Sequence, residues 1–167
     1  MGTPAEDLVE TLQDSEATVA TAESLTGGRL AARITNVPGS SGVFVGGVVS
    51  YWTDVKVDVL GVPRETVDEY GVVSAECARE MAEGVRRLMG TTYGLSTTGV
   101  AGPQRQEDEP VGTVFIGIAG PDRVEAVPLD LSGDRFTIQE ASVDEAVSAL
   151  ADMIALDIQG SEDSALG

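Results

Sequence analysis

ATVATAESLTGGRLAARITN, residues 17–36, carries a strand pattern and a helix pattern joined by a glycine pair. We predict a strand over residues 17–22 and a helix over RLAARITN, which NVPGSSG then breaks with proline and glycine. A strand that leads through a tight turn into a helix is the repeating unit of sheets covered by helices. The stretch therefore indicates an α/β fold.

The rest of the chain repeats this alternation of strands and helices. Further strands are predicted at 43–51, 92–98, 111–119 and 123–129, and helices at 4–14, around Lys56, over VPRETVDEYG, over SAECAREMAEGVRRLMG and at 137–157. This order predicts a three-layer α/β/α sandwich with a mainly parallel, mixed sheet of about five strands. We expect one domain over residues 1–160 and a flexible tail over residues 161–167.

The charge of the chain argues against two classes of partner. Asp and Glu number 28 against 10 for Lys and Arg, so the formal net charge is −18. A surface this acidic repels the phosphates of nucleic acids and of anionic lipids, and we expect neither nucleic acid nor membrane as a partner. Because the acids are spread along the chain, the composition fits a salt-adapted surface.

Nothing in the sequence predicts membrane insertion or export. No apolar run approaches the ~18 residues of a membrane-spanning helix, and the N-terminus lacks the pattern of a signal peptide. We therefore expect a cytoplasmic protein. Cys77 is the single cysteine, which excludes an internal disulfide and a thiolate cluster, and its helical neighbours predict a packing role.

Lys56 stands out because it is the only lysine, and the chain has no histidine. Without histidine a Ser-His-Asp triad is impossible and zinc lacks its usual imidazole ligands, so we expect no metal site. Serine hydrolases without histidine can use a lysine whose pKa is lowered by burial or by a nearby cation. Tyr51 precedes Lys56 by five residues. The alternatives, an ordinary solvated lysine and a surface tyrosine, stay open at this point.

Two stretches follow predicted strands and carry the residues of a ligand site. Residues 23–28 (ESLTGG) place Ser24 before a helix start, whose free N–H groups can hold an anion or an oxyanion. Residues 96–103 (STTGVAGP) offer hydroxyls and glycines that suit a phosphate or a ribose. Helix capping by Ser24 or Thr26 and ordinary turn chemistry explain the same residues equally well. Neither stretch contains a nucleotide-binding fingerprint of the G-x-G-x-x-G or G-K-[ST] type.

Taken in order, several motifs resemble the CinA C-terminal domain family. They are AESLTGG, FVGGVVSYWTDVK, LGV, YGVVS, EMAEG, TTGVAGP, PVGTV and GDR, and they span about residues 5 to 156. The resemblance implies a three-layer α/β/α domain. Because the family includes nicotinamide mononucleotide deamidases, it also implies hydrolysis of the carboxamide of nicotinamide mononucleotide to nicotinic acid mononucleotide and ammonia, without a metal or a cofactor.

The resemblance assigns Ser24 as the nucleophile and Tyr51 and Lys56 as the groups that activate it. Neutral Lys56, directly or through Tyr51, would take the proton of Ser24. Substrate contacts are implied for Thr26, Gly27 and Gly28 at the oxyanion, and for Thr98, Gly99, Ala101, Gly102 and Arg135 at the phosphate and ribose. Arg135 is also the cation expected to lower the pKa of Lys56. An equally open alternative makes Arg135 a structural partner of a carboxylate.

Two stretches depart from the family pattern. Leu25 stands where many relatives have a cysteine, which removes a thiol but not the expected nucleophile. Residues 104–109 (QRQEDE) replace a glycine-rich run and predict an anionic rim, which Arg105 partly offsets.

A second hypothesis for the function is a mononucleotide-binding or regulatory module without turnover. We expect the protein to form a homo-oligomer, most simply a dimer. Members of the family commonly do so, and several apolar residues of this chain could lie at the surface.

Overall fold

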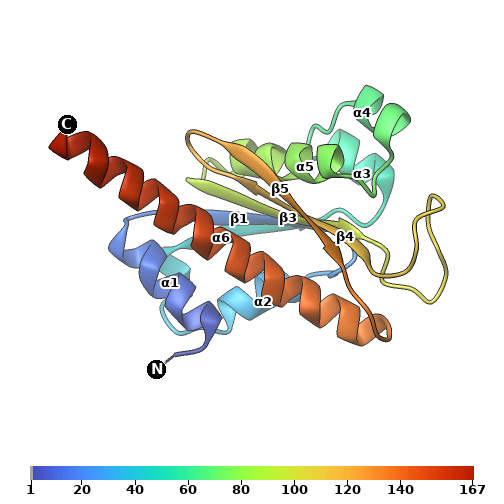
Figure 1. The fold of residues 1–167 in the computed structure, drawn as a ribbon, viewed down its shortest axis with the longest axis horizontal. Coiled ribbons are helices and arrows are strands. Elements are labelled where there is room, and N and C mark those ends of the chain that lie inside the picture. Colours follow the sequence, from blue (N-terminus) through green and yellow to red (C-terminus); the bar gives the residue numbers. More distant parts are fainter. Residues whose placement is uncertain (1) are drawn as a thin grey trace.

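A five-stranded mixed sheet lies between two layers of helices in the computed structural model, which describes residues 2–167 (Figure 1). The strands are β1 (Val19–Glu23), β2 (Phe44–Val49), β3 (Tyr93–Gly99), β4 (Thr113–Ala119) and β5 (Val124–Asp130). The helices are α1 (Pro4–Asp14), α2 (Arg29–Thr35), α3 (Thr53–Asp58), α4 (Arg64–Tyr70), α5 (Ala75–Met89) and α6 (Arg135–Leu166), with a 3-10 turn η1 (Ser40–Gly42). The predicted three-layer α/β/α sandwich is confirmed.

The sheet runs in the order β2-β1-β3-β4-β5, and its two halves differ in strand direction. β1 pairs in parallel with β2 and with β3, whereas β4 pairs antiparallel with β3 and with β5. All five residues of β1 are buried, as expected of a central strand covered on both faces. The carboxyl ends of the three parallel strands therefore meet at one edge of the sheet.

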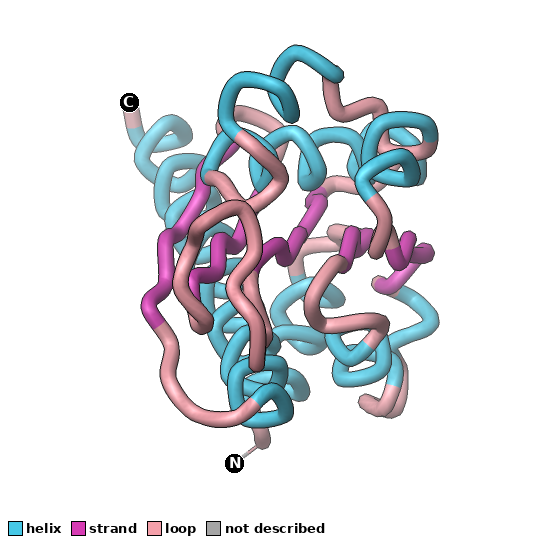
Figure 2. The backbone as a smooth tube through the Cα atoms, turned by 90° about the vertical axis from the view of Figure 1, so that its right-hand side faces the viewer, coloured by secondary structure: helices cyan, strands magenta, loops and turns pink. Residues whose placement is uncertain are grey.

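Loops gather at this edge, which faces the viewer in Figure 2, with helices above and below the strands. The turn after β1 leads into α2, the segment after β2 leads into α3, and a long loop joins β3 to β4. Ligand sites of open α/β sheets form at the carboxyl ends of parallel strands. The topology therefore brings both sequence-predicted site stretches to one place.

Helix α5 lies directly on β3 and β4 because glycines leave room for its backbone. A Cβ atom added to Gly117 would collide with the carbonyl oxygen of Ala78, and one added to Gly94 would collide with that of Ala82. The helix begins as predicted, with the Ser74 hydroxyl accepting a hydrogen bond from the N–H of Cys77 at 3.1 Å. Cys77 is fully buried in the apolar layer between helix and sheet, which confirms its packing role.

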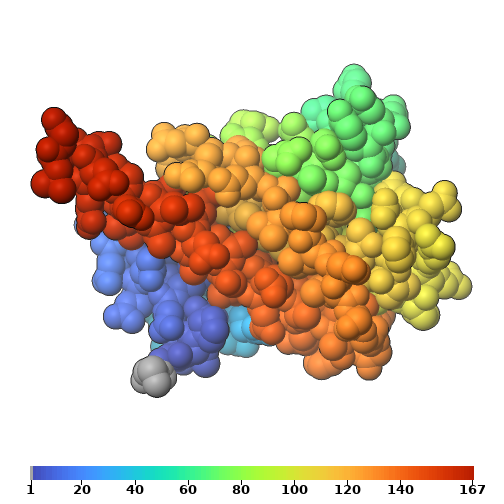
Figure 3. All heavy atoms as spheres, in the orientation of Figure 1, coloured from blue at the N-terminus to red at the C-terminus, as the bar shows by residue number. Residues whose placement is uncertain are grey.

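Helix α6 is longer than its sequence pattern predicts. It runs from Arg135 to Leu166, so the helix end predicted near residue 157 is wrong, and residues 161–166 of the predicted tail are helical. No proline interrupts this stretch, and Gly160 alone costs only about 1 kcal/mol, which the helix tolerates. The last turns extend past the body of the molecule (Figure 3), and Leu166 at the end of the helix is exposed.

None of the helices within residues 2–167 combines the length and the apolar character that crossing a membrane requires.

Candidate functional site

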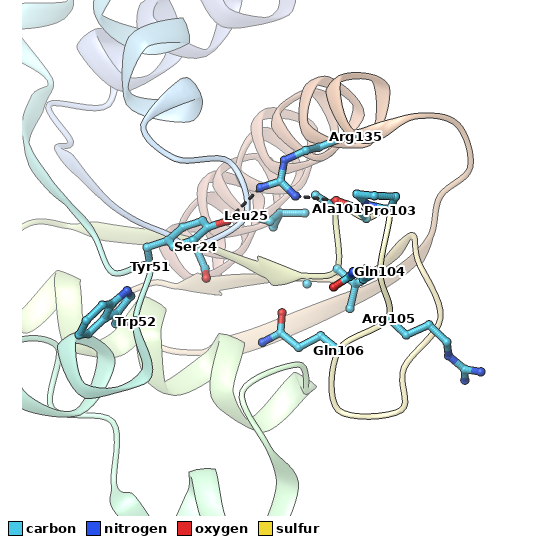
Figure 4. A pocket seen from close by; sticks show the side chains of 13 residues that line it. Ser24, Leu25, Tyr51, Trp52, Ala101, Pro103, Gln104, Arg105, Gln106 and Arg135 are labelled. Carbon is cyan, nitrogen blue, oxygen red and sulfur yellow. Dashed lines mark hydrogen bonds between the residues drawn. The ribbon is translucent and has the colours of Figure 1, made fainter.

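Three strand ends and the start of α6 form the walls of one cavity of about 550 Å³. The sheet ladder continues into its floor, because the N–H of Ser24 donates to Thr97 O at 3.0 Å and the N–H of Ser50 donates to Glu23 O at 2.7 Å. The cavity is lined by Ser24, Leu25, Tyr51, Trp52, residues 99–106 and Arg135 (Figure 4). The two predicted site stretches therefore meet, as the topology requires.

Lys56 lies behind Ser24, with a side chain that is only 1% exposed. Its Nζ is 2.9 Å from Ser24 Oγ, 2.6 Å from Ser50 O and 3.4 Å from Tyr51 O. A neutral amine has two N–H donors and one lone pair, so it can donate to both carbonyl oxygens while its lone pair accepts the hydroxyl proton of Ser24. The geometry is that of a nucleophile in direct contact with its base. The solvated-lysine alternative is therefore wrong.

Burial lowers the pKa of Lys56, and the negative charges that Cys77 and Glu107 carry when ionised act more weakly in the opposite direction. No arginine contributes, so the expectation that Arg135 supplies the shift is wrong. The Arg135 guanidinium instead donates to Tyr51 Oη and to Gly102 O. Among residues 2–167 no carboxylate forms an ion pair with Lys56, which leaves desolvation as the dominant effect.

The neighbouring thiol is not a competing nucleophile. Burial raises the pKa of Cys77 to about 12, so Cys77 is protonated at neutral pH. Ser24 and Lys56 remain as the nucleophile-type and base-type side chains in direct contact at this site.

The lowered pKa of Lys56 predicts a pH-dependent contribution to stability. Between the folded-state pKa and the ordinary value of 10.5, the unfolded chain binds more protons at Lys56 than the folded chain does. The free energy of unfolding of the wild type, relative to Lys56→Met, should therefore rise with pH in this window by up to about 1.4 kcal/mol per pH unit. Urea unfolding of both proteins from pH 7 to pH 10 measures it, and a flat difference would contradict a lowered pKa.

Tyr51 lines the cavity, but its hydroxyl does not reach Lys56. Arg135 Nη2 donates to Tyr51 Oη at 2.9 Å, and Arg135 Nη1 donates to Gly102 O at 2.6 Å (Figure 4). The relay from Lys56 through Tyr51 is therefore not formed, and the amine contacts Ser24 directly. Because the Tyr51 oxygen accepts from a guanidinium, its own O–H proton is left to donate. Arg135 also makes no ion pair among the described residues, so the structural-partner alternative does not hold.

Glu23 occupies the helix start that the sequence assigns to an oxyanion. Its carboxylate is 1% exposed and accepts from the N–H of Leu30 at 2.7 Å, from the N–H of Ala31 at 3.1 Å and from the Thr26 hydroxyl at 2.6 Å. The N–H groups of Leu30 and Ala31 therefore already have an acceptor within the protein and are not free to bind a ligand. Sequence reasoning missed Glu23, although a carboxylate just before a helix start is a known pattern for satisfying its first N–H groups.

Several predicted substrate contacts consequently lie outside the cavity. Thr26 is buried against Glu23, and Gly27 and Gly28 form the positive-φ turn that leads into α2. Thr98 is also buried, and its hydroxyl donates to Val72 O at 2.7 Å. The glycine turn and these two threonines therefore lie beneath the residues that line the cavity and support them.

Other predicted contacts lie in the cavity wall together with residues that the sequence did not single out. The predicted residues there are Gly99, Ala101, Gly102 and Arg135, and the additional ones are Leu25, Trp52, Val100, Pro103, Gln104, Arg105 and Gln106. Trp52 is 74% exposed. It is the only tryptophan of the chain and directly follows Tyr51, and this position in the sequence is the signal that could have found it.

Comparison with known proteins places the chain in a family. A sequence model of the CinA C-terminal domain matches residues 2–154. A CinA-like protein from Frankia casuarinae is 51% identical over 144 residues, covering 86% of this chain and 33% of that protein. A putative competence-damage inducible protein from Acetivibrio thermocellus is 48% identical over 133 residues, covering 79% and 32%. The chain thus spans about a third of the length of these curated relatives.

Solved structures agree with the sequence match. A CinA superfamily protein from Klebsiella pneumoniae 700603 superimposes with a TM-score of 0.86 at 30% identity, over 90% of this chain and 98% of that one. The competence/damage inducible protein CihA from Agrobacterium tumefaciens gives a TM-score of 0.83 at 31% identity, over 91% and 96%. From the sequence match and the shared fold together, the chain belongs to the CinA C-terminal domain family.

Proposed function

We propose that this domain is an amidohydrolase that converts nicotinamide mononucleotide to nicotinic acid mononucleotide and ammonia. The observation that carries the proposal is the 2.9 Å contact between Lys56 Nζ and Ser24 Oγ at the floor of the cavity. A buried amine with a lowered pKa is the base that a histidine-free serine hydrolase requires. The relatives are named for competence and damage, so the reaction itself rests on this contact and on the family resemblance.

The reaction begins at Ser24. Neutral Lys56 takes the hydroxyl proton while Oγ attacks the carboxamide carbon, and the carbonyl oxygen becomes an oxyanion. The Lys56 ammonium then gives this proton to the leaving nitrogen, so that ammonia departs and Ser24 holds the acyl group as an ester. Lys56 next takes a proton from water, which attacks the ester. It finally returns this proton to Ser24 as the acid product leaves, and the acid releases its own proton to solvent to become the carboxylate.

In this proposal the Tyr51 hydroxyl is the side-chain donor to the oxyanion. It lies in the cavity wall with Ser24, and the Arg135 guanidinium fixes its oxygen at 2.9 Å. A cation bound to the phenol oxygen makes the phenol proton a stronger donor toward negative charge that develops in the cavity. Tyr51 therefore acts on the substrate in this proposal and not on Lys56.

Tyr51→Phe tests this role. We expect kcat for ammonia release to fall about 10²-fold, the usual cost of one oxyanion donor, with little change in the binding of the mononucleotide. Steady-state kinetics and ligand titration measure the two quantities separately. Tyr70→Phe, on exposed α4 away from the cavity, is the matched control. A Tyr51→Phe enzyme with full kcat would remove the phenol from the mechanism.

The cavity suits a mononucleotide in size and in charge. Its volume of about 550 Å³ lies within the ~300–1,000 Å³ that small-molecule sites occupy. Leu25 and Trp52 offer apolar surface to a pyridine ring near Ser24, and Arg105 and Arg135 are the two cations of the wall. Arg135 gives a phosphate group a local positive site on a chain whose net charge is −18, whereas the Arg105 side chain points away from the cavity in Figure 4 and donates to Asp108 O at 2.6 Å.

Product analysis decides between turnover and binding alone. The protein is incubated with nicotinamide mononucleotide in multimolar potassium chloride, which also tests the salt-adapted surface, and in low salt. We expect nicotinic acid mononucleotide and ammonia in equal amounts, and no ammonia from nicotinamide, which lacks the ribose and phosphate. Binding of the mononucleotide without either product would overturn the enzyme and leave the mononucleotide-binding module.

A further inference from the structure

The loop between β3 and β4 forms much of the cavity wall, and one of its side chains holds the loop tip in place. Pro103, Gln104, Arg105 and Gln106 line the cavity from this loop. At its base the N–H of Gly112 donates to Val100 O at 2.9 Å, which closes the loop next to the sheet. The base alone leaves the tip, residues 104–109, without support from the sheet.

The tip is a tight turn that needs an external contact. Gln106 and Glu109 form an isolated bridge, with the N–H of Glu109 donating to Gln106 O at 2.9 Å. The two residues between them, Glu107 and Asp108, have φ values of 52° and 61°, the left-handed region that residues other than glycine rarely adopt. Such a turn persists only where surrounding contacts over-determine it.

Glu107 supplies that contact by reaching across to the segment before α5. Its Oε1 accepts from the N–H of Val73 at 2.8 Å and its Oε2 accepts from the N–H of Val72 at 3.1 Å. Gly71 leaves the space, since a Cβ there would lie 2.8 Å from Glu107 Oε2. The same segment is tied to the sheet through Thr98, whose hydroxyl donates to Val72 O.

We propose that Glu107 is a positioning residue that clamps the loop over residues 104–109 against Val72 and Val73, and so sets the cavity wall that binds substrate. The predicted anionic rim is thus only partly correct, because the Glu107 carboxylate faces two backbone N–H groups. In Figure 4 the loop lies beside the segment that leads to α5, with Gln104 and Gln106 directed into the cavity. The substrate part of the inference rests on the proposed function, whereas the clamp itself does not.

Glu107→Gln tests the clamp, and Asp108→Asn is its matched control. Both variants remove one negative charge from the same turn, but only Glu107 contacts the backbone of residues 72 and 73. A glutamine side chain has one acceptor oxygen and one donor nitrogen, so it can satisfy one of the two N–H groups and opposes the other. Asparagine tolerates the left-handed backbone at residue 108.

Two readouts separate the clamp from the reaction. Amide hydrogen exchange at Val72 and Val73 should become about 10-fold faster in Glu107→Gln and stay unchanged in Asp108→Asn. KM for nicotinamide mononucleotide should rise about 5- to 10-fold in Glu107→Gln, with kcat on its pH-independent plateau within about 2-fold of wild type. Fluorescence of Trp52, the only tryptophan and part of the cavity wall, reports binding of the mononucleotide without turnover.

Each outcome decides one claim. Unchanged exchange at Val72 and Val73 in Glu107→Gln overturns the clamp, and an equal change in Asp108→Asn overturns it in favour of a charge effect. Faster exchange with unaltered KM and unaltered affinity overturns the link to substrate. A wild type that produces no ammonia defeats the proposed reaction, while the exchange measurement still decides the clamp.

Discussion

Lys56→Met is expected to lower kcat for ammonia release from nicotinamide mononucleotide by roughly 10²- to 10⁴-fold, the usual contribution of a general base. The loss should be close to complete in practice because the chain has no other lysine and no histidine to take over. Methionine keeps the length and apolar stem of the side chain in a site that is 1% exposed. Steady-state assays at pH 7 to 10 measure the loss.

The control for this prediction is Arg64→Met, which removes an exposed cation on the neighbouring helix α4 and breaks only a surface ion pair with Asp54. Its kcat should stay within about 2-fold of wild type, since surface ion pairs contribute little. Retained binding of the mononucleotide by Lys56→Met shows that the cavity is intact. Full activity in Lys56→Met would mean that the Ser24–Lys56 mechanism is wrong.

Glu23→Ala is expected to lower the free energy of unfolding by about 2–4 kcal/mol, because it leaves the buried N–H of Leu30 and the half-buried N–H of Ala31 without their acceptor, while the Thr26 hydroxyl keeps its contact with Thr97. The carboxylate joins the last residue of β1 to the first turn of α2 through contacts of 2.7 Å and 3.1 Å to Leu30 and Ala31. Ser24 follows directly in the chain, so loosening of this turn should also reduce kcat. Urea unfolding gives the stability change.

Glu10→Ala on the exposed face of α1 is the matched control for Glu23→Ala. This variant truncates the same type of side chain at a solvent-exposed position. It should change the free energy of unfolding by less than about 0.5 kcal/mol. If Glu23→Ala cost less than about 1 kcal/mol, water would be replacing the carboxylate. Glu23 would then not be the group that organises the turn before Ser24.

Local sequence patterns predict most of the fold, because they report burial and helix ends directly. The strand over residues 17–22 and the packing of Cys77 depend on neighbours in the chain, and both are confirmed, with the strand at Val19–Glu23. The division of the sheet into parallel and antiparallel halves depends on contacts between distant strands. The end of α6 was missed because no proline or cap marks it, and a single glycine does not stop a helix.

In the site, too, the contacts between residues that are distant in the chain could not be predicted from local sequence patterns. Ser24 and Lys56 are 32 residues apart, and the family motifs, not the spacing, predicted that they meet. Arg135 and Tyr51 are 84 residues apart, and their contact depends on how α6 crosses the strand ends. Glu23 joins the end of β1 to Thr26 and to the first turn of α2, a contact that depends on side-chain positions and was not predicted from the sequence.

The most direct test of the central claim is ammonia release from nicotinamide mononucleotide by wild type and by Ser24→Ala, with binding measured in parallel from Trp52 fluorescence. The proposed mechanism predicts turnover by the wild type, a loss of at least about 10³-fold in Ser24→Ala and nearly equal binding by both proteins. Ammonia release by Ser24→Ala at the wild-type rate would contradict the assignment of Ser24 as the nucleophile.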